Sequence, residues 1–224
     1  METIDIVTEF KEKASLVSAV IHEAEKIEDA FDIAVSLCNE VENRLCNITE
    51  ARLRNATETR LCNVMESKKM GIIAAPELDN SMFELLEKRC LAKGISLIQN
   101  QLRGHASGIE IGLTFADFGI AETGTVVVCS DSEDKRLATM ISDIHAVLLY
   151  KSDIRASALD MADELAALTQ RTSSYTAFIT GPSRTADIER VLAIGVHGPL
   201  ELHIILLEGT LHNISAKGQK MEVQ

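Results

Sequence analysis

The sequence predicts an α/β fold with a mostly parallel central sheet flanked by helices, preceded by an N-terminal helical segment. From residue 71 onward, short apolar runs of strand length alternate with amphipathic stretches of helical length, as in parallel βαβ units. The first 70 residues instead space their apolar side chains as helices do. We therefore expect a helical segment at 1–70, an α/β domain at 71–208 and a polar tail at 209–224.

The N-terminal segment begins with an expected amphipathic surface helix over residues 8–26. Leu16, Val20 and Ala24 recur there at helical spacing among charged residues. Residues 36–67 then repeat an eight-residue pattern four times. A period of eight advances about 80° per repeat on an α-helix, so the repeated leucines do not share one face.

The repeat is best explained as a tandem duplication within a helical segment. Three of its positions are cysteines, Cys38, Cys46 and Cys62, and a metal or redox role for them is the alternative. We favour the first interpretation, because a free cysteine is more often a small buried hydrophobic residue.

The first βαβ unit of the α/β domain is expected at residues 72–98. Residues 72–75 form a short apolar run typical of a buried parallel strand. A capping box from Ser81 to Glu84 predicts the start of a helix, which Gly94 ends, and residues 95–98 form the next strand.

Further strands are expected at 109–118, 126–129, 144–149, 177–180 and 203–207. Between the third and fourth of these, Asp153 is expected to start an alanine-rich helix. Its apolar face would hold Leu159, Ala162, Leu165 and Ala166.

Charge and composition exclude several classes of protein. The 224 residues include 22 Lys and Arg but 34 Asp and Glu, a net charge of −12, which argues against nucleic-acid and anionic membrane partners. No apolar run is long enough to span a membrane. The five cysteines lack the spacing of a metal or iron–sulfur site, so we expect no metal, no cofactor and a cytoplasmic location.

The first candidate loop, at residues 121–125, combines Glu122 with Thr123, Gly124 and Thr125. A small loop of glycine and threonine before an apolar strand can hold a carboxylate or phosphate through backbone N–H groups and hydroxyls. Such triplets are also common as simple tight turns.

The second candidate loop follows the strand expected at 177–180. It contains Ser183, Arg184 and Thr185, and then Asp187 and Glu189. The planar guanidinium of Arg184 suits a carboxylate or phosphate. The alternative is that Arg184 pairs with one of the two carboxylates and only stabilises the loop.

The third candidate is His197, which lies between Gly195 and Gly198 in a loop that precedes a strand. A histidine in such a loop is a candidate for acid–base chemistry or ligand contact. His145 and His203 fall in apolar strands, where satisfied core residues are expected. The motifs of serine hydrolases, Walker-type nucleotide sites and Rossmann folds are absent.

Taken together, residues 117–125, 181–189 and 195–199 resemble the LUD domain, most closely the lactate utilisation protein C (YkgG) group. The resemblance covers about residues 71–207. It implies a fold like that of NagB, RpiA and the CoA transferases. It also implies a place in L-lactate degradation to pyruvate, in which iron–sulfur-carrying sister subunits transfer the electrons.

The resemblance therefore implies a cluster-free subunit that binds a small carboxylate or phosphate, or its partner subunits. The alternative is a stand-alone enzyme like the CoA transferases or sugar-phosphate isomerases. In that case Glu122, Asp187 or Glu189 would act as nucleophile or base, and Arg184 would hold the anion. A ligand-sensing scaffold and a homo-oligomer are left open.

Both candidate loops are expected to form one anion pocket. Residues 123–125 should lie close to residues 183–185, with His197 at the rim, because both loops leave the ends of neighbouring strands. Charge-assisted hydrogen bonds would then hold a carboxylate or phosphate there.

Overall fold

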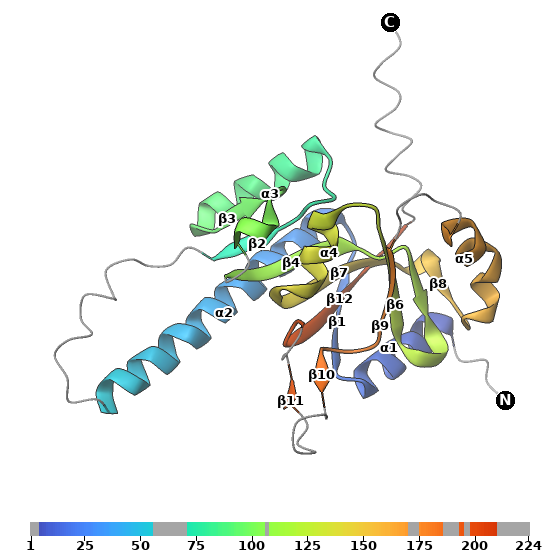
Figure 1. Ribbon diagram of the computed structural model, residues 1–224, viewed down its shortest axis with the longest axis horizontal. Helices are drawn as coiled ribbons and strands as arrows, with labels where there is room; N and C mark the ends of the chain where they lie inside the picture. The colour runs from blue at the N-terminus through green and yellow to red at the C-terminus, as the bar shows by residue number, and fades with distance from the viewer. Residues whose placement is uncertain are drawn as a thin grey trace, which may run out of the picture.

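The computed structural model describes residues 5–55, 71–105, 108–169, 175–185, 193–194 and 198–209 (Figure 1). The helices are α1 (Ile6–Leu16), α2 (Ile27–Asn55), α3 (Asn80–Lys93), α4 (Glu133–Met140) and α5 (Ala162–Thr169). The strands are β1 (Ala19–Ala24), β2 (Ile72–Ala74), β3 (Ser96–Ile98), β4 (Ile109–Phe115), β5 (Phe118–Ile120), β6 (Thr125–Ser130), β7 (Ser142–Tyr150), β8 (Ile154–Arg155), β9 (Tyr175–Ile179), β10 (Arg184–Thr185), β11 (Ala193–Ile194) and β12 (Glu201–Leu207).

The central sheet has six strands in the order β1-β12-β7-β4-β2-β3, and every neighbouring pair is parallel. The inner strands β4 and β7 are buried along nearly their whole length, which explains their continuous apolar sequences. The expected unit β2-α3-β3 is present. The predicted α/β fold with a mostly parallel central sheet is therefore confirmed.

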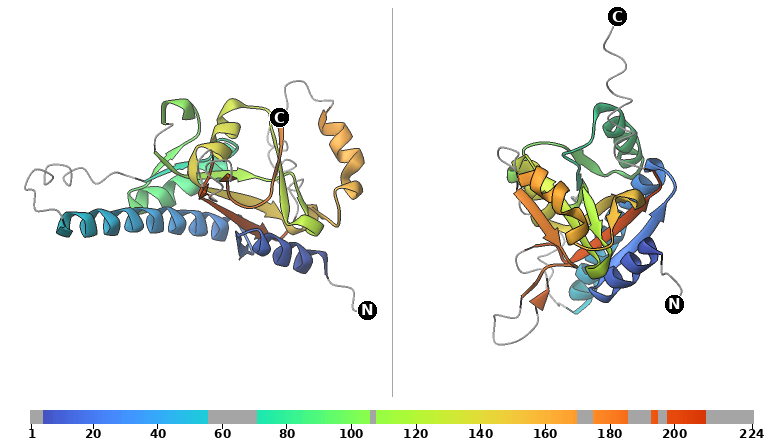
Figure 2. Two further views of the ribbon diagram at one scale, coloured as in Figure 1. Left: turned by 60° about the horizontal axis from the view of Figure 1, so that its bottom comes forward. Right: turned by 90° about the vertical axis from the view of Figure 1, so that its right-hand side faces the viewer.

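A second sheet of four strands has the order β8-β5-β6-β9 and is mostly antiparallel. Both strands expected at 126–129 and 177–180 belong to it rather than to the central sheet, and a two-stranded ladder joins β10 to β11. Figure 2 shows this second sheet and α5 toward one end of the molecule, with the far end of α2 toward the other. The first two candidate loops adjoin β6 and β9, so they belong to the second sheet rather than to the central one.

The hydrophobic core lies on both faces of the central sheet. On one face, α2 and α3 pack their buried side chains, including Phe31 and Leu86, against alternate residues of the strands. On the other, Phe10 and Ala14 of α1 share a cluster with the second sheet and with alternate residues of β7 and β12. Each aromatic or leucine side chain in such a core contributes about 2–5 kcal/mol to the free energy of unfolding. For this reason α1 and α2 are structural parts of the α/β body.

The prediction of one helix over residues 8–26 is wrong for the second half of this range. The chain leaves α1 at Leu16, passes through Ser18 at φ +68° and enters β1, which pairs with β12. The run Val17 to Ile21 is rich in β-branched residues, which favour a strand when a partner strand is available. The segment 1–70 thus contributes a strand to the central sheet.

Long helix α2 carries the first part of the eight-residue repeat through Asn55. The remainder of the repeat, including Cys62, lies outside the described residues. Cys38 is buried in the core cluster beside α3, as expected for a small hydrophobic residue.

The helix expected from Asp153 begins later, at Ala162. Its predicted inward face is wrong for Leu159, which is 86% exposed, and for Ala162 and Ala166, which are also exposed. The intervening residues form β8 and a short turn, in which the Asp160 carboxylate accepts hydrogen bonds from the backbone N–H and the hydroxyl of Ser157. Such local side-chain bonds compete with helix formation. In α3, Asp79 rather than Ser81 is the N-cap, since its side chain accepts from the N–H of Met82.

Candidate functional site

The first candidate loop is packed against α1. Gly124 has φ +63°, and a Cβ atom on it would lie 2.2 Å from the backbone N of Ala14. Glycine is therefore required here by a close approach between two backbones and by a left-handed conformation. In the structure, this glycine packs closely against α1.

The threonines of this loop form a chain of hydroxyls that reaches the second loop. Thr125 Oγ1 lies 2.8 Å from Thr123 Oγ1 and 2.7 Å from Thr180 Oγ1. Thr180 follows β9, which runs antiparallel to β6 with Val126 opposite Ile179. The structure therefore brings the two loops together at one end of the second sheet, and uses the Thr125 hydroxyl to connect them.

Glu122 supports a neighbouring segment of backbone. Its carboxylate Oε1 accepts from the N–H of Ala158 at 3.0 Å, and its own N–H donates to the carbonyl of Ala156 at 3.0 Å. These bonds hold the turn before α5 against the end of β5. The side chain is exposed, so it remains accessible to solvent as well.

The second loop is tied to the turn between α1 and β1. Gly181 has φ +76° and faces the carbonyl of Val17, which would lie 2.2 Å from a Cβ atom. Arg184 Nη2 donates to that carbonyl at 3.0 Å and to Ser18 Oγ at 2.5 Å. The exposed guanidinium is thus partly engaged by the N-terminal segment.

The other predicted site residues are described less fully. Thr185 is placed by its backbone in β10, opposite Ala193. Asp187, Glu189 and His197 lie outside the described residues, so the predicted pairing of Arg184 with either carboxylate also falls there.

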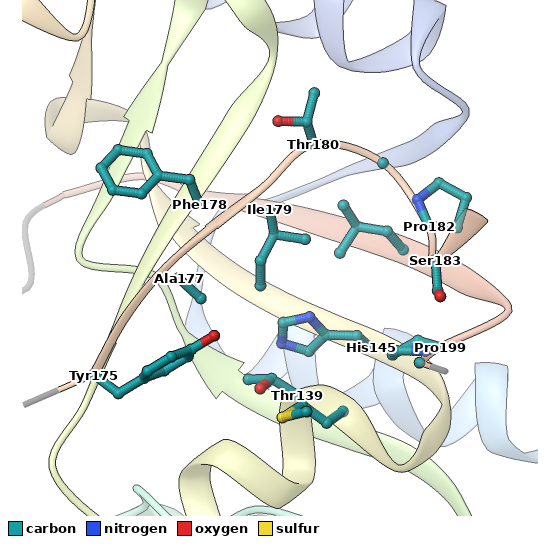
Figure 3. A pocket seen from close by; sticks show the side chains of 14 residues that line it. Thr139, His145, Tyr175, Ala177, Phe178, Ile179, Thr180, Pro182, Ser183 and Pro199 are labelled. Carbon is teal, nitrogen blue, oxygen red and sulfur yellow. The ribbon is translucent and has the colours of Figure 1, made fainter. Parts of the chain in front are cut away.

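A cavity of about 280 Å³ lies beneath β9 (Figure 3). Among the described residues its wall combines a mostly apolar surface with four hydroxyl groups and one imidazole. It is lined by Thr139, Met140, His145, Tyr175, Ala177, Phe178, Ile179, Thr180, Gly181, Pro182, Ser183, Gly198, Pro199 and Leu202. We call it the β9 pocket.

The β9 pocket shares Ser183 with the predicted anion site, and Gly198 with the third candidate loop. The N–H of Ser183 donates to the carbonyl of Pro199 at 3.0 Å, which holds the two loops together at one end of the pocket. The sequence does not predict this pocket, because its wall comes from β9, α4, β7, β12 and two loops that are far apart in the chain.

His145 lies in the wall of the pocket, in the middle of the view in Figure 3. It is 1% exposed, and its Nε2 lies 2.9 Å from Thr114 Oγ1. Burial, together with the nearby positive charge of Lys135, lowers the pKa of His145 to about 3. The imidazole is therefore uncharged at neutral pH.

Lys135 is itself buried and is held by an ion pair. Its Nζ lies 2.5 Å from Glu77 Oε1, while Glu77 Oε2 accepts from the N–H of Phe115 at 2.9 Å. Burial raises the pKa of the Glu77 carboxyl, and the contacts with Lys135 and Phe115 oppose that increase. The pair fixes the first turn of α4 to the loop that follows β2.

A shallower hollow of about 320 Å³ lies between β1 and α2 and is lined in part by His22 and Glu40. Behind it, polar side chains form a chain of contacts. His22 Nε2 lies 2.9 Å from His203 Nδ1, His203 Nε2 lies 2.9 Å from Glu201 Oε2, and Arg44 Nη1 lies 2.5 Å from Glu201 Oε1.

Within the described part of the chain, no three His, Cys, Asp or Glu side chains are grouped so as to hold a metal ion. Over the same residues, no helix has the length and apolar character needed to cross a membrane. The three cysteines whose side chains are described, Cys38, Cys90 and Cys129, are each buried without a disulfide. Burial raises the pKa of the Cys90 thiol to about 11, with Glu87 adding to the effect.

The parallel sheet, the second sheet packed on it and the pocket between them define an α/β protein with a small-molecule-sized site. A profile of the LUD domain matches residues 7–207, and the chain belongs to this family. The match begins in α1, in agreement with the structural role of the N-terminal elements.

Several relatives match over less than half of their length. Lactate utilization protein C of Halalkalibacterium halodurans is 38% identical over 106 residues, which are 46% of each chain. Lactate utilization protein C of Bacillus subtilis is 34% identical over 105 residues, 46% of this chain and 44% of that one. The uncharacterized protein YkgG of Escherichia coli is 33% identical over 106 residues, 46% of each.

One solved structure supports the fold. The crystal structure of a DUF162 family protein from Deinococcus radiodurans has a TM-score of 0.50 and 16% sequence identity. The likeness covers 90% of this chain and 96% of that chain. At this identity it is evidence for a shared fold.

Proposed function

We propose that this chain is a component of an L-lactate utilisation system and that it binds a small carboxylate or phosphate anion in the β9 pocket. The observation that carries the proposal is the combination of LUD family membership with a pocket near the lower end of the size range of ligand sites. The assignment to lactate utilisation rests on the names of the relatives from Halalkalibacterium and Bacillus.

The chemistry of the pocket suits a small anion at its Ser183 end. The hydroxyl of Ser183 can donate to an anionic oxygen. Arg184, the next residue, is not part of the described pocket lining, and its exposed guanidinium lies at the turn between α1 and β1, from which it would have to reach the anion. Both present contacts of Arg184 use Nη2, which leaves the rest of the planar fork for a ligand.

The proposed partners are the subunits that carry the iron–sulfur clusters. The cysteine spacing of this chain contains no cluster motif, and the cysteines whose side chains are described are separately buried. In the proposed system the electrons from lactate pass through the partners, while this chain binds the anion or completes the site of a partner.

Binding by the purified chain tests the anion site. Calorimetric titration with L-lactate, pyruvate and inorganic phosphate should show binding of at least one of them, with a matching rise in melting temperature. We expect Arg184→Ala to weaken this binding at least tenfold while lowering the melting temperature little. If none of these anions binds, the anion site is wrong.

A matched variant separates charge from loop anchoring. Ser18→Gly removes the hydroxyl that Arg184 contacts, and a glycine accepts the φ of +68° at this position. If the guanidinium itself holds the anion, Ser18→Gly should bind as wild type does. If both variants lose binding and stability equally, Arg184 is only a structural tie.

The pathway is tested in the cell that encodes the chain. Deletion of its gene should abolish growth on L-lactate but not on pyruvate, and a tagged chain should co-purify with cluster-bearing subunits. Normal growth on L-lactate together with no co-purification would contradict the proposed function.

A further inference from the structure

We propose, resting on the function proposed above, that His145 is the specificity-determining residue of the β9 pocket. In this proposal it recognises the uncharged hydroxyl or keto oxygen of a small 2-hydroxy or 2-oxo acid.

The position of His145 is set by the sheet rather than by a mobile side chain. The residue lies on β7, between β4 and β12, and the bond to Thr114 on β4 orients its ring. Figure 3 shows the ring between Thr139 on one side and Ile179 on the other, facing the space beneath β9. A ligand in the pocket would therefore meet the imidazole in one defined orientation.

The charged groups near His145 on α4 and on the loop after β2 pair with each other. Lys135, whose charge acts on the imidazole, has its Nζ 2.5 Å from Glu77 Oε1, and Glu77 also accepts from a backbone N–H. Asp117, at the end of β4, acts on Glu77 and accepts from the N–H of Cys129. The described pocket lining contributes no Asp, Glu, Lys or Arg.

A neutral buried imidazole discriminates by hydrogen bonding. A hydroxyl or keto oxygen can pair with it, whereas an analogue that lacks this oxygen leaves a polar group without the partner the site offers. A second carboxylate at the same place would be a buried charge without an opposing cation, which is strongly unfavourable. The ligand class that fits is a monocarboxylate with an uncharged oxygen on the neighbouring carbon.

The test compares ligands that differ at a single group. Calorimetry with the full chain should show that L-lactate or pyruvate binds at least tenfold more tightly than propionate, which lacks the oxygen, or methylmalonate, in which a carboxylate replaces it, at both pH 6 and pH 8. In His145→Leu this preference over propionate should disappear, and His145→Gln should recover part of it. His203→Gln, a buried histidine outside the pocket lining, is the control and should retain the preference.

The outcomes separate this inference from the proposed function. If L-lactate and propionate bind equally well, the role of His145 is wrong while the anion site stands. If none of the acids binds, the proposed anion site fails and this inference fails with it. Loss of the preference in His203→Gln as well would show that the effect is a general one on the sheet, and would also overturn the inference.

Discussion

His22 Nε2 and His203 Nδ1 lie 2.9 Å apart, and this hydrogen bond joins the edge strand β1 to β12. The proton positions follow from the partners. The carboxylate of Glu201 can only accept, so His203 carries its proton on Nε2 and, when neutral, accepts on Nδ1. His22 then donates from Nε2, and its neutral form has no proton on Nδ1.

This arrangement predicts lower stability in mild acid. Burial and the neighbouring His203 lower the pKa of His22 in the folded state, and Glu40 only partly opposes them. Below about pH 6.5, the unfolded chain takes up protons that the folded chain resists, so the free energy of unfolding falls as the pH falls. His145, with a pKa of about 3, acts in the same direction.

Denaturant unfolding at pH 7.5 and pH 5 measures this effect. The wild-type chain should be less stable at pH 5. His22→Gln should cost about 1 kcal/mol at pH 7.5 but should lose less on acidification, whereas the exposed His105→Gln should behave as wild type does. Equal wild-type stability at the two pH values would contradict the prediction.

Gly124→Ala should destabilise the fold by roughly 2–4 kcal/mol. The added Cβ would lie 2.2 Å from the backbone N of Ala14 and would also require a left-handed residue. Gly94→Ala is the control, because Gly94 has φ +70° but no atom within 4 Å of the added Cβ, and should cost only about 1–2 kcal/mol. Similar losses in both variants, measured by denaturant unfolding, would show that packing against α1 is unimportant.

A chain that begins at residue 71 tests the division predicted near residue 70. Removal of residues 1–70 takes away β1, uncovers the edge of β12 and deletes Phe10 and Phe31 from the two core clusters. We expect the truncated protein to aggregate, since an apolar open edge invites pairing with other chains. Co-expression of residues 1–70 should restore soluble protein, and a truncated chain that unfolds cooperatively by itself would support two separable units.

Glu122→Gln separates structural and catalytic roles of the first candidate loop. The amide oxygen of glutamine can still accept from the N–H of Ala158, so stability should change by less than about 0.5 kcal/mol. We also expect growth on L-lactate to be unchanged. Loss of growth in a stably folded variant would favour the stand-alone enzyme with Glu122 as nucleophile or base.

Local sequence patterns were sufficient for most helices and strands. Gly94 ends α3 in a left-handed conformation, as its position after Lys93 predicts. The continuous apolar run of β7 identifies a buried parallel strand, because both of its faces are covered. These features depend on the backbone conformation and burial of neighbouring residues, and short stretches of sequence are enough to predict both.

Patterns of short range failed where a distant partner decided the conformation. Residues 19–24 have a helical spacing of apolar side chains, yet they form β1 because β12, in which Leu202 pairs with Ala19, 183 positions earlier, offers a parallel edge. In the same way, only the tertiary structure shows that α1 packs against Gly124.

The sequence by itself determined the α/β class and the family motifs, since the class follows from the alternation of strand and helix patterns and the motifs are short runs of residues. Only the tertiary structure decided which polar groups face open space. His145 belongs to an unremarkable apolar strand in the sequence, and the β9 pocket appears only when β9 lies across β7 and α4. The physical reason is that a cavity is a property of surfaces from separate segments, which no local pattern encodes.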